Sequence, residues 1–188
     1  MEKETEKLLV ETIQKDPHQF GILFDEYYTV IFNYVFRRLG DYDITKDILS
    51  ETFLKAFLNI GKFRWKGVPI SFWLYRIANN EIQQSFRREK YRPGSLDLIV
   101  ESKGWDTPDP ASTLEVKRQA EKEIQRDADF LFIQQEIKKL PAIYQEVLAL
   151  RYFEQKSIKE IAAIIDKKEG TIKSLLSRGV SKFREIAG

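Results

Sequence analysis

Apolar residues recur along almost the whole chain at the three- and four-residue spacing of an amphipathic α-helix. Glycine, proline and helix-capping residues separate the periodic segments from one another. The pattern therefore predicts an all-α fold. The expected helices span residues 2–14, 17–39, 44–60, 71–88, 111–139, 141–153, 158–165 and 169–186.

One long polar stretch interrupts this pattern. Pro93 and Gly94 end the first group of helices, and no sustained periodicity follows as far as Pro110. This stretch predicts a linker between two small helical domains. The expected units are residues 1–92, the linker at residues 93–110, and residues 111–188.

The expected helix 71–88 has an unusual polar surface. Away from its apolar face it is rich in amides and arginines, with two aromatic rings and Glu81 as its one acid. These positions are Phe72, Tyr75, Arg76, Asn79, Asn80, Gln83, Gln84, Arg87 and Arg88. Amides hydrogen-bond base edges, arginines bind phosphate, and rings stack on bases that have left the duplex. From this helix alone two interpretations stay open: contact with single-stranded nucleic acid, or packing of Phe72 and Trp73 on neighbouring helices.

The segment before this helix is a loop, because two glycines and a proline break helical order in residues 61–70. The loop is both aromatic and basic. The residues that make it so are Phe63, Arg64, Trp65 and Lys66. Such a loop can hold an unstacked base. Alternatively, its aromatic side chains pack on the core and anchor the loop there.

The expected helix 44–60, for which Asp43 is the predicted cap, carries acids beside exposed leucines. Its outward positions are Asp47, Ser50, Glu51, Leu54, Lys55 and Leu58, whereas Ile44, Ile48, Thr52, Phe53, Ala56, Phe57 and Ile60 are expected to face inward. An acidic surface with apolar side chains can dock a basic partner. The alternative is the edge of an ordinary helical bundle.

The C-terminal segment has the pattern of a helix-turn-helix. Ser157 and Glu160 form a capping box for the helix 158–165, and a tight turn at 166–168 leads into the longer helix 169–186. The outer face of the second helix is small, hydroxyl-rich and basic. It carries Thr171, Lys173, Ser174, Ser177, Arg178, Ser181 and Lys182. Small side chains let the backbone approach a major groove, so the pattern favours duplex DNA binding over an ordinary helical hairpin.

Composition narrows the classes of function. The 188 residues, 43% of them hydrophobic, can bury a core, and the chain has no cysteine and one histidine, His18. Disulfides, thiolate metal sites and histidine-dependent triads are therefore excluded, and no glycine-rich phosphate loop occurs. We expect no enzyme, no cofactor and no metal site. The charged, amphipathic N-terminus and the lack of a long apolar run predict a cytoplasmic protein without membrane insertion.

Four segments, taken in order, resemble the bacterial RNA polymerase sigma factors of the extracytoplasmic-function group. They are DITKDILSETFLKAF at 43–57, SFWLYRIANNEIQQSFRR at 71–88, LPAIYQEVLALRYFEQKSIKEIA at 140–162 and GTIKSLLSRG at 170–179. The resemblance covers roughly residues 20–90 and 111–186, which are similar to sigma regions two and four.

This resemblance implies a role for each surface. The helix with Asp47 and Glu51 would bind core RNA polymerase, and the loop 61–70 with helix 71–88 would melt the −10 element and hold an extruded base. The outer face of helix 169–186 would read the −35 element in promoter DNA. Members of this family are often held by an anti-sigma protein, so the resemblance also implies such a partner.

Three positions and one short run depart from the family pattern, the run being PISFWL at 69–74 in place of a more typical FSTWL-like run. Asp166 stands where a glycine is common, Leu175 where an arginine is frequent, and Gln84 where an aspartate is common. Aspartate tolerates a left-handed backbone, so the turn at Asp166 is expected to form. These departures bear on which promoter sequence is read more than on the function itself.

Two other functions remain open from the residues alone. A helix-turn-helix regulator would bind duplex DNA through the C-terminal domain without acting as a sigma factor. The aromatic and amide-rich surface of residues 71–88 argues against it, because a duplex-only regulator has no use for base-stacking side chains. An adaptor that binds polymerase through the acidic helix alone would not bind duplex DNA at all.

Overall fold

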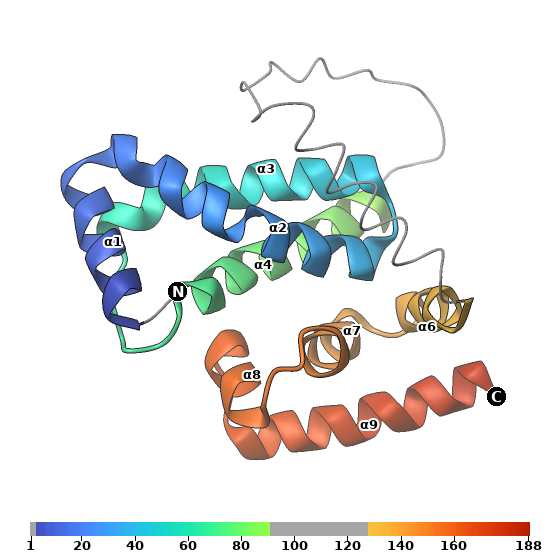
Figure 1. The fold of residues 1–188 in the computed structure, drawn as a ribbon. Helices are drawn as coiled ribbons and strands as arrows, with labels where there is room; N and C mark the ends of the chain where they lie inside the picture. Colours follow the sequence, from blue (N-terminus) through green and yellow to red (C-terminus); the bar gives the residue numbers. More distant parts are fainter. Residues whose placement is uncertain (1–2, 91–127) are drawn as a thin grey trace.

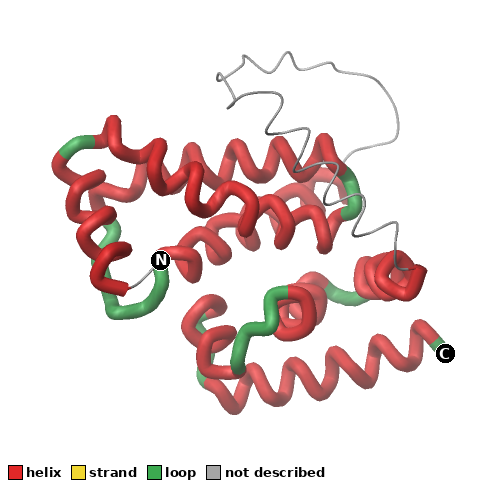
Figure 2. Tube along the Cα trace, viewed as in Figure 1, coloured by secondary structure: helices red, strands yellow, loops and turns green. Residues whose placement is uncertain are grey.

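The computed structural model describes residues 3–90 and 128–188, and all its regular elements within them are helical (Figures 1 and 2). The all-α prediction is confirmed for this part of the chain. The N-terminal group contains α1 (Lys3–Lys15), α2 (Phe20–Leu39), α3 (Tyr42–Asn59) and α4 (Ile70–Lys90), with short turns η1 (Pro17–Gln19) and η2 (Ile60–Lys62). The C-terminal group contains α6 (Ala128–Lys138), α7 (Ala142–Leu148), η3 (Ala149–Phe153), α8 (Ile158–Ile165) and α9 (Glu169–Ala187).

Local capping chemistry sets several helix ends. Asp16 accepts a hydrogen bond from the His18 amide at 3.1 Å, as expected for the residue before Pro17. Gly40 ends α2 with a left-handed φ of 62°, a conformation that costs glycine little. The expected cap of α3 was wrong. Asp41, not Asp43, accepts from the Ile44 amide at 2.9 Å, because α3 begins at Tyr42.

The N-terminal group packs around aromatic side chains of α2 and α3. The Phe24 and Phe53 rings lie 4.7 Å apart, and Phe20 meets Phe57 edge to ring at 5.3 Å. Ile44 was expected to face inward but is 38% exposed, since it lies in the first turn of α3, at the end of the bundle. The other expected inward positions of α3 are buried or half-buried.

Helix α1 contacts the bundle where α3 ends and α4 begins. Gln14 Nε2 donates to the backbone oxygens of Ile60 at 2.9 Å and Phe63 at 2.8 Å. Glu6, which is buried, accepts from the Tyr27 hydroxyl and lies 3.4 Å from the Ile70 amide at the start of α4. The helix therefore holds both ends of the loop that precedes α4.

The expected helix-turn-helix is present in α8 and α9. Ser157 and Glu160 form the predicted capping box, with the Ser157 amide donating to Glu160 at 2.8 Å and the Glu160 amide donating to Ser157 at 3.2 Å. Asp166 ends α8 in the left-handed conformation with φ 60°, so the predicted turn forms without glycine. α9 then packs against α7 and α8.

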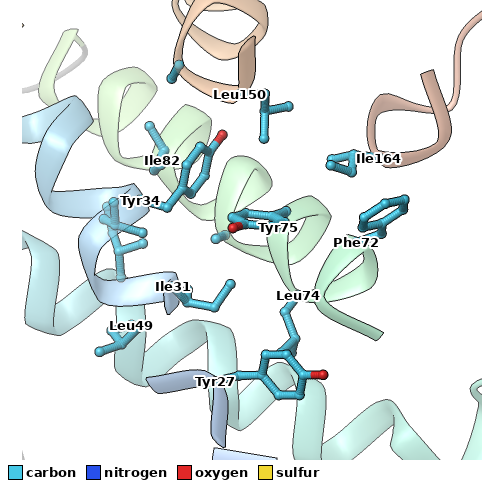
Figure 3. Packing of buried hydrophobic residues seen from close by; sticks show 14 of the residues in the cluster. Tyr27, Ile31, Tyr34, Leu49, Phe72, Leu74, Tyr75, Ile82, Leu150 and Ile164 are labelled. Atoms are coloured by element: carbon cyan, nitrogen blue, oxygen red, sulfur yellow. The ribbon is translucent and has the colours of Figure 1, made fainter. Parts of the chain in front are cut away.

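The two groups of helices share one hydrophobic core. Figure 3 shows Phe72 and Tyr75 of α4 facing Leu150 of η3 and Ile164 of α8. Each of these four side chains is at most 5% exposed. The expected linker and the first part of the expected helix 111–139 lie outside the described residues. Within the described ranges, no helix is long and apolar enough to cross a membrane.

Candidate nucleic-acid interface

An open cavity of about 480 Å³ lies between α3 and α4. Its wall combines an aromatic ring, amides, an ion pair and an exposed arginine. The lining residues are Lys55, Asn59, Trp73, Ile77, Asn80, Glu81, Gln83, Gln84 and Arg87. A ring can stack on a base, amides can hydrogen-bond its edge, and an arginine can hold the adjoining phosphate.

An ion pair joins the two helices inside this cavity. Lys55 Nζ of α3 lies 2.6 Å from Glu81 Oε1 of α4. Gln84 Nε2 donates to the same oxygen at 3.4 Å. The Glu81 side chain is 6% exposed and that of Lys55 38%. The carboxylate is therefore buried in the cavity wall, and the lysine side chain lies between it and solvent.

The loop before α4 continues the cavity wall. The rings of Phe63 and Trp73 are tilted against each other at 4.9 Å, so the loop meets the cavity at this pair. Phe63 and Trp65 are half-buried, whereas Arg64 and Lys66 are exposed. Both aromatic residues pack on the core cluster, and the two basic residues are free to meet phosphate.

The residues of α4 expected to bind nucleic acid divide into two sets. Asn80, Arg87 and Arg88 are exposed, and Gln83 is half-buried. Phe72, Tyr75 and Asn79 are 5%, 1% and 2% exposed, so their expected place on the surface is wrong for this structure.

Tyr75 and Asn79 are buried because other helices supply their partners. The Asn79 carbonyl oxygen accepts from the Tyr34 hydroxyl at 2.6 Å and from the Arg38 guanidinium. The Tyr75 hydroxyl donates to Glu154 at 2.8 Å. Burial, with Glu154 adding to it, raises the pKa of Tyr75 well above its usual value, so the hydroxyl stays protonated and donates.

Arg76 is exposed but engaged. Its Nε donates to the backbone oxygen of Ile164 at 2.9 Å, and its terminal nitrogen donates to that of Ala163 at 2.8 Å. These carbonyls belong to the last turn of α8, where a helix leaves its oxygens without internal partners. An arginine predicted to bind a DNA strand therefore caps the first helix of the helix-turn-helix.

Further polar contacts accompany this one. Arg37 of α2 lies 3.5 Å from Glu154 and donates to the backbone oxygen of Phe153 at 3.3 Å. Gln134 of α6 donates to the backbone oxygens at the end of α2, those of Phe36 at 3.1 Å and Arg37 at 2.9 Å. Both domains thus contribute donors and acceptors to one interface.

Arg38 lies fully buried beside this interface, at 1% exposure. Its Nε and one terminal nitrogen have no hydrogen-bond partner among the described residues. Burial raises the pKa of Glu146 on α7, and the positive charge of Arg38 opposes that rise. The charge of Arg38 therefore acts on Glu146 across the boundary between the two groups of helices.

The outer face of α9 is free. All seven predicted residues are exposed, from Thr171 to Lys182. Ile172 and Leu175 on the opposite side are buried, which fixes the helix orientation. Leu175 therefore serves the core at the position where the resemblance would have placed a phosphate-binding arginine.

The expected polymerase-binding surface on α3 is mostly exposed. Asp47, Ser50 and Glu51 are exposed, as is Leu58 at 66%, while Leu54 is half-buried. Lys55 differs from the rest, since it turns toward Glu81 in the cavity. Among the described residues, no cluster of histidine, aspartate or glutamate could hold a metal ion.

Sequence reasoning did not single out Trp73, Ile77 or Glu81 as parts of one site. A signal for it exists, because Trp73, Ile77, Asn80, Gln84 and Arg87 follow one another at four- and three-residue steps along α4. That stripe was divided between an apolar and a polar face. The contribution of α3 through Lys55 and Asn59 is a tertiary contact with no local signal.

Comparison with known proteins assigns each of these two groups of helices to a protein family. Residues 23–92 match the family model of sigma-70 region 2, and residues 133–183 match that of sigma-70 region 4. The chain is 30% identical over 190 residues to the ECF RNA polymerase sigma factor SigW of Bacillus subtilis, covering 98% of this chain and 97% of that protein. It is 30% identical over 179 residues to the ECF RNA polymerase sigma factor BldN of Streptomyces coelicolor, covering 95% of this chain and 64% of that protein.

Two solved structures share the fold. CnrH, in complex with the cytosolic domain of CnrY, superposes with a TM-score of 0.62 at 20% identity, over 96% of this chain and 95% of that one. The sigma factor RpoE of Bartonella quintana, in complex with the anti-sigma factor NepR, gives a TM-score of 0.59 at 19% identity, over 89% of this chain and 95% of that one. Both likenesses extend over most of the chain.

Proposed function

This chain belongs to the extracytoplasmic-function (ECF) RNA polymerase sigma factors, which direct transcription initiation through regions 2 and 4, and we propose how its surfaces share that task. Residues 1–92 bind core polymerase and open the −10 element. Residues 111–188 read the −35 element, and residues 93–110 join the two. The chain is not an enzyme, because it belongs to a family of non-enzymatic transcription factors.

The cavity between α3 and α4 is the observation that carries the proposal. We assign it to one base extruded from the non-template strand, with the loop 61–70 at its edge. Trp73 offers a ring for stacking, Asn80 an amide for the base edge, and Arg87 a cation for phosphate. Arg64 and Lys66 are exposed beside it and can follow the strand.

The energies are of the right size for this task. Unstacking a base step costs a few kcal/mol, and stacking one base on an aromatic side chain returns about 1–3 kcal/mol. Charge-assisted contacts to phosphate add to this. One ring and two or three cations at the cavity therefore suffice to hold an opened base.

Two further surfaces complete the assignment. The exposed outer face of α9 enters the major groove, where Lys173 and Arg178 reach phosphates or guanine edges. The exposed acids Asp47 and Glu51 of α3 bind a basic surface of core polymerase. Because RpoE of Bartonella quintana was solved with an anti-sigma factor, we also assign this chain an anti-sigma partner, and we place its action in the cytoplasm.

Run-off transcription on a promoter library, with core polymerase alone and with this chain added, tests the function as a whole. The strand-capture step is tested by Asn80→Ala and Trp73→Ala, which remove the amide and the ring of the cavity and should reduce open-complex formation while leaving closed promoter binding nearly intact. Gln135→Ala on α6, an exposed amide far along the chain from the cavity, is the control. Equal loss of closed and open complexes would contradict the assignment.

A further inference from the structure

Glu81 is a buried acid with an unused oxygen inside the proposed base cavity. We propose that this cavity prefers an unpaired base with an exocyclic amino group (adenine, cytosine or guanine) over thymine, and that Glu81 reads that amino group. The inference rests on the proposed function, since the cavity must first receive a base. It adds a specificity that the sequence pattern and the family match do not assign.

The hydrogen bonds of Glu81 leave one acceptor free. Lys55 Nζ at 2.6 Å and Gln84 Nε2 at 3.4 Å both approach Oε1. Among the described residues, no donor is hydrogen-bonded to Oε2. The side chain is only 6% exposed and lines the cavity. Because Glu81 lines the cavity, this oxygen can accept a hydrogen bond from a ligand there, and a hydrogen bond to a charged acceptor is worth more than one to a neutral acceptor.

Lys55 offsets the negative charge of Glu81, which would otherwise oppose the binding of DNA. Its ammonium group neutralises Glu81, so that the carboxylate does not repel an approaching phosphate. The ion pair also crosses from α3 to α4 and fixes the carboxylate in place. Oε1 of Glu81 is thus held by Lys55 and Gln84, and Oε2 can accept a hydrogen bond from a bound base.

The edges of the four bases differ in what they offer a carboxylate. Adenine and cytosine carry an amino donor where thymine carries the O4 acceptor, and guanine carries its amino group at N2. Thymine has a single N–H flanked by two carbonyl oxygens, each of which repels a carboxylate. A hydrogen bond to a charged group is worth about a tenfold change in affinity. Thymine should therefore bind about tenfold more weakly than an amino-bearing base.

Single-stranded DNA binding to the full chain assembled on core polymerase tests this inference, with polymerase alone as the blank. The probes are a short oligothymidylate and three versions with one thymine replaced by adenine, cytosine or guanine, each scanned along the oligonucleotide. At one position, each amino-bearing base should raise the affinity by about tenfold. Glu81→Gln offers both a donor and an acceptor, so it should bind thymine as well as the others and remove the preference.

The readout is a ratio of affinities within one variant, so a partly unfolded preparation does not distort it. Glu185→Gln, which removes an exposed acid of α9 outside the cavity, should keep the preference. Oligonucleotide binding without any base preference overturns the role of Glu81 and leaves strand capture standing. A preference that survives in Glu81→Gln also overturns it, whereas failure to bind any of the oligonucleotides overturns strand capture itself.

Discussion

The hydrogen bond between Tyr75 and Glu154 offers a direct test of how the two domains pack. The Tyr75 hydroxyl is buried and donates to Glu154 at 2.8 Å, so Glu154→Ala leaves this donor without an acceptor. A buried donor left unpaired costs about 1–3 kcal/mol. We therefore expect Glu154→Ala to lower the free energy of unfolding by about 2 kcal/mol.

A double-mutant cycle separates this bond from the other contact of Glu154. Tyr75→Phe removes the donor and keeps the ring. In that background Glu154→Ala loses only its contact with Arg37 at 3.5 Å, so the two single changes should not add. We expect a coupling free energy of about 1–2 kcal/mol.

Urea unfolding measures both quantities, followed by circular dichroism and by tryptophan fluorescence. Of the three tryptophans, Trp65 and Trp73 lie in the N-terminal domain and Trp105 in the expected linker. Fluorescence therefore reports mainly on the N-terminal domain and circular dichroism on both domains. Glu185→Ala, an exposed acid of α9, should change the stability by less than about 0.5 kcal/mol. Single changes that add to within about 0.3 kcal/mol would refute the contact between the two residues in solution.

Two further predictions concern the other surfaces. Lys173→Ala and Arg178→Ala should each weaken binding to duplex promoter DNA, measured over a salt series, and each lost phosphate contact should reduce the salt slope by about one; unchanged affinity would contradict the assignment of this face of α9 to the major groove. Asp47→Lys should weaken the binding of core polymerase, because it reverses an exposed charge of the α3 surface. Asp25→Lys on α2 is its matched control, and equal affinities of the two variants for polymerase would remove α3 as the docking surface.

Local sequence signals predicted the fold because capping residues act over three or four positions. Gly40 marked the end of α2, and the Ser157 and Glu160 pair marked the start of α8. The expected cap Asp43 lies two residues after the observed cap Asp41, in a segment where both residues are acids. The exposed face of α9 was equally predictable, since its apolar positions recur with helical period against α7 and α8.

Which polar side chains of α4 contact other helices could not be predicted in the same way. Tyr75 is buried by Glu154, and Arg76 is held by carbonyls of α8, each from a distant part of the chain. Periodicity assigned both to solvent because polar and amphipathic side chains look exposed when their partners are unknown. The Lys55 and Glu81 pair escaped notice for the same reason, since it joins two helices that packing alone brings together.

The two hydrogen bonds from Arg76 to the end of α8 impose a cost on any strand that needs this arginine. A strand can take Arg76 only after α8 has moved away, so its apparent affinity is the intrinsic affinity multiplied by the fraction of molecules with the domains apart. Each 1.4 kcal/mol of contact free energy lowers that affinity about tenfold. Any partner that separated α8 from α4 would restore this affinity without touching the strand.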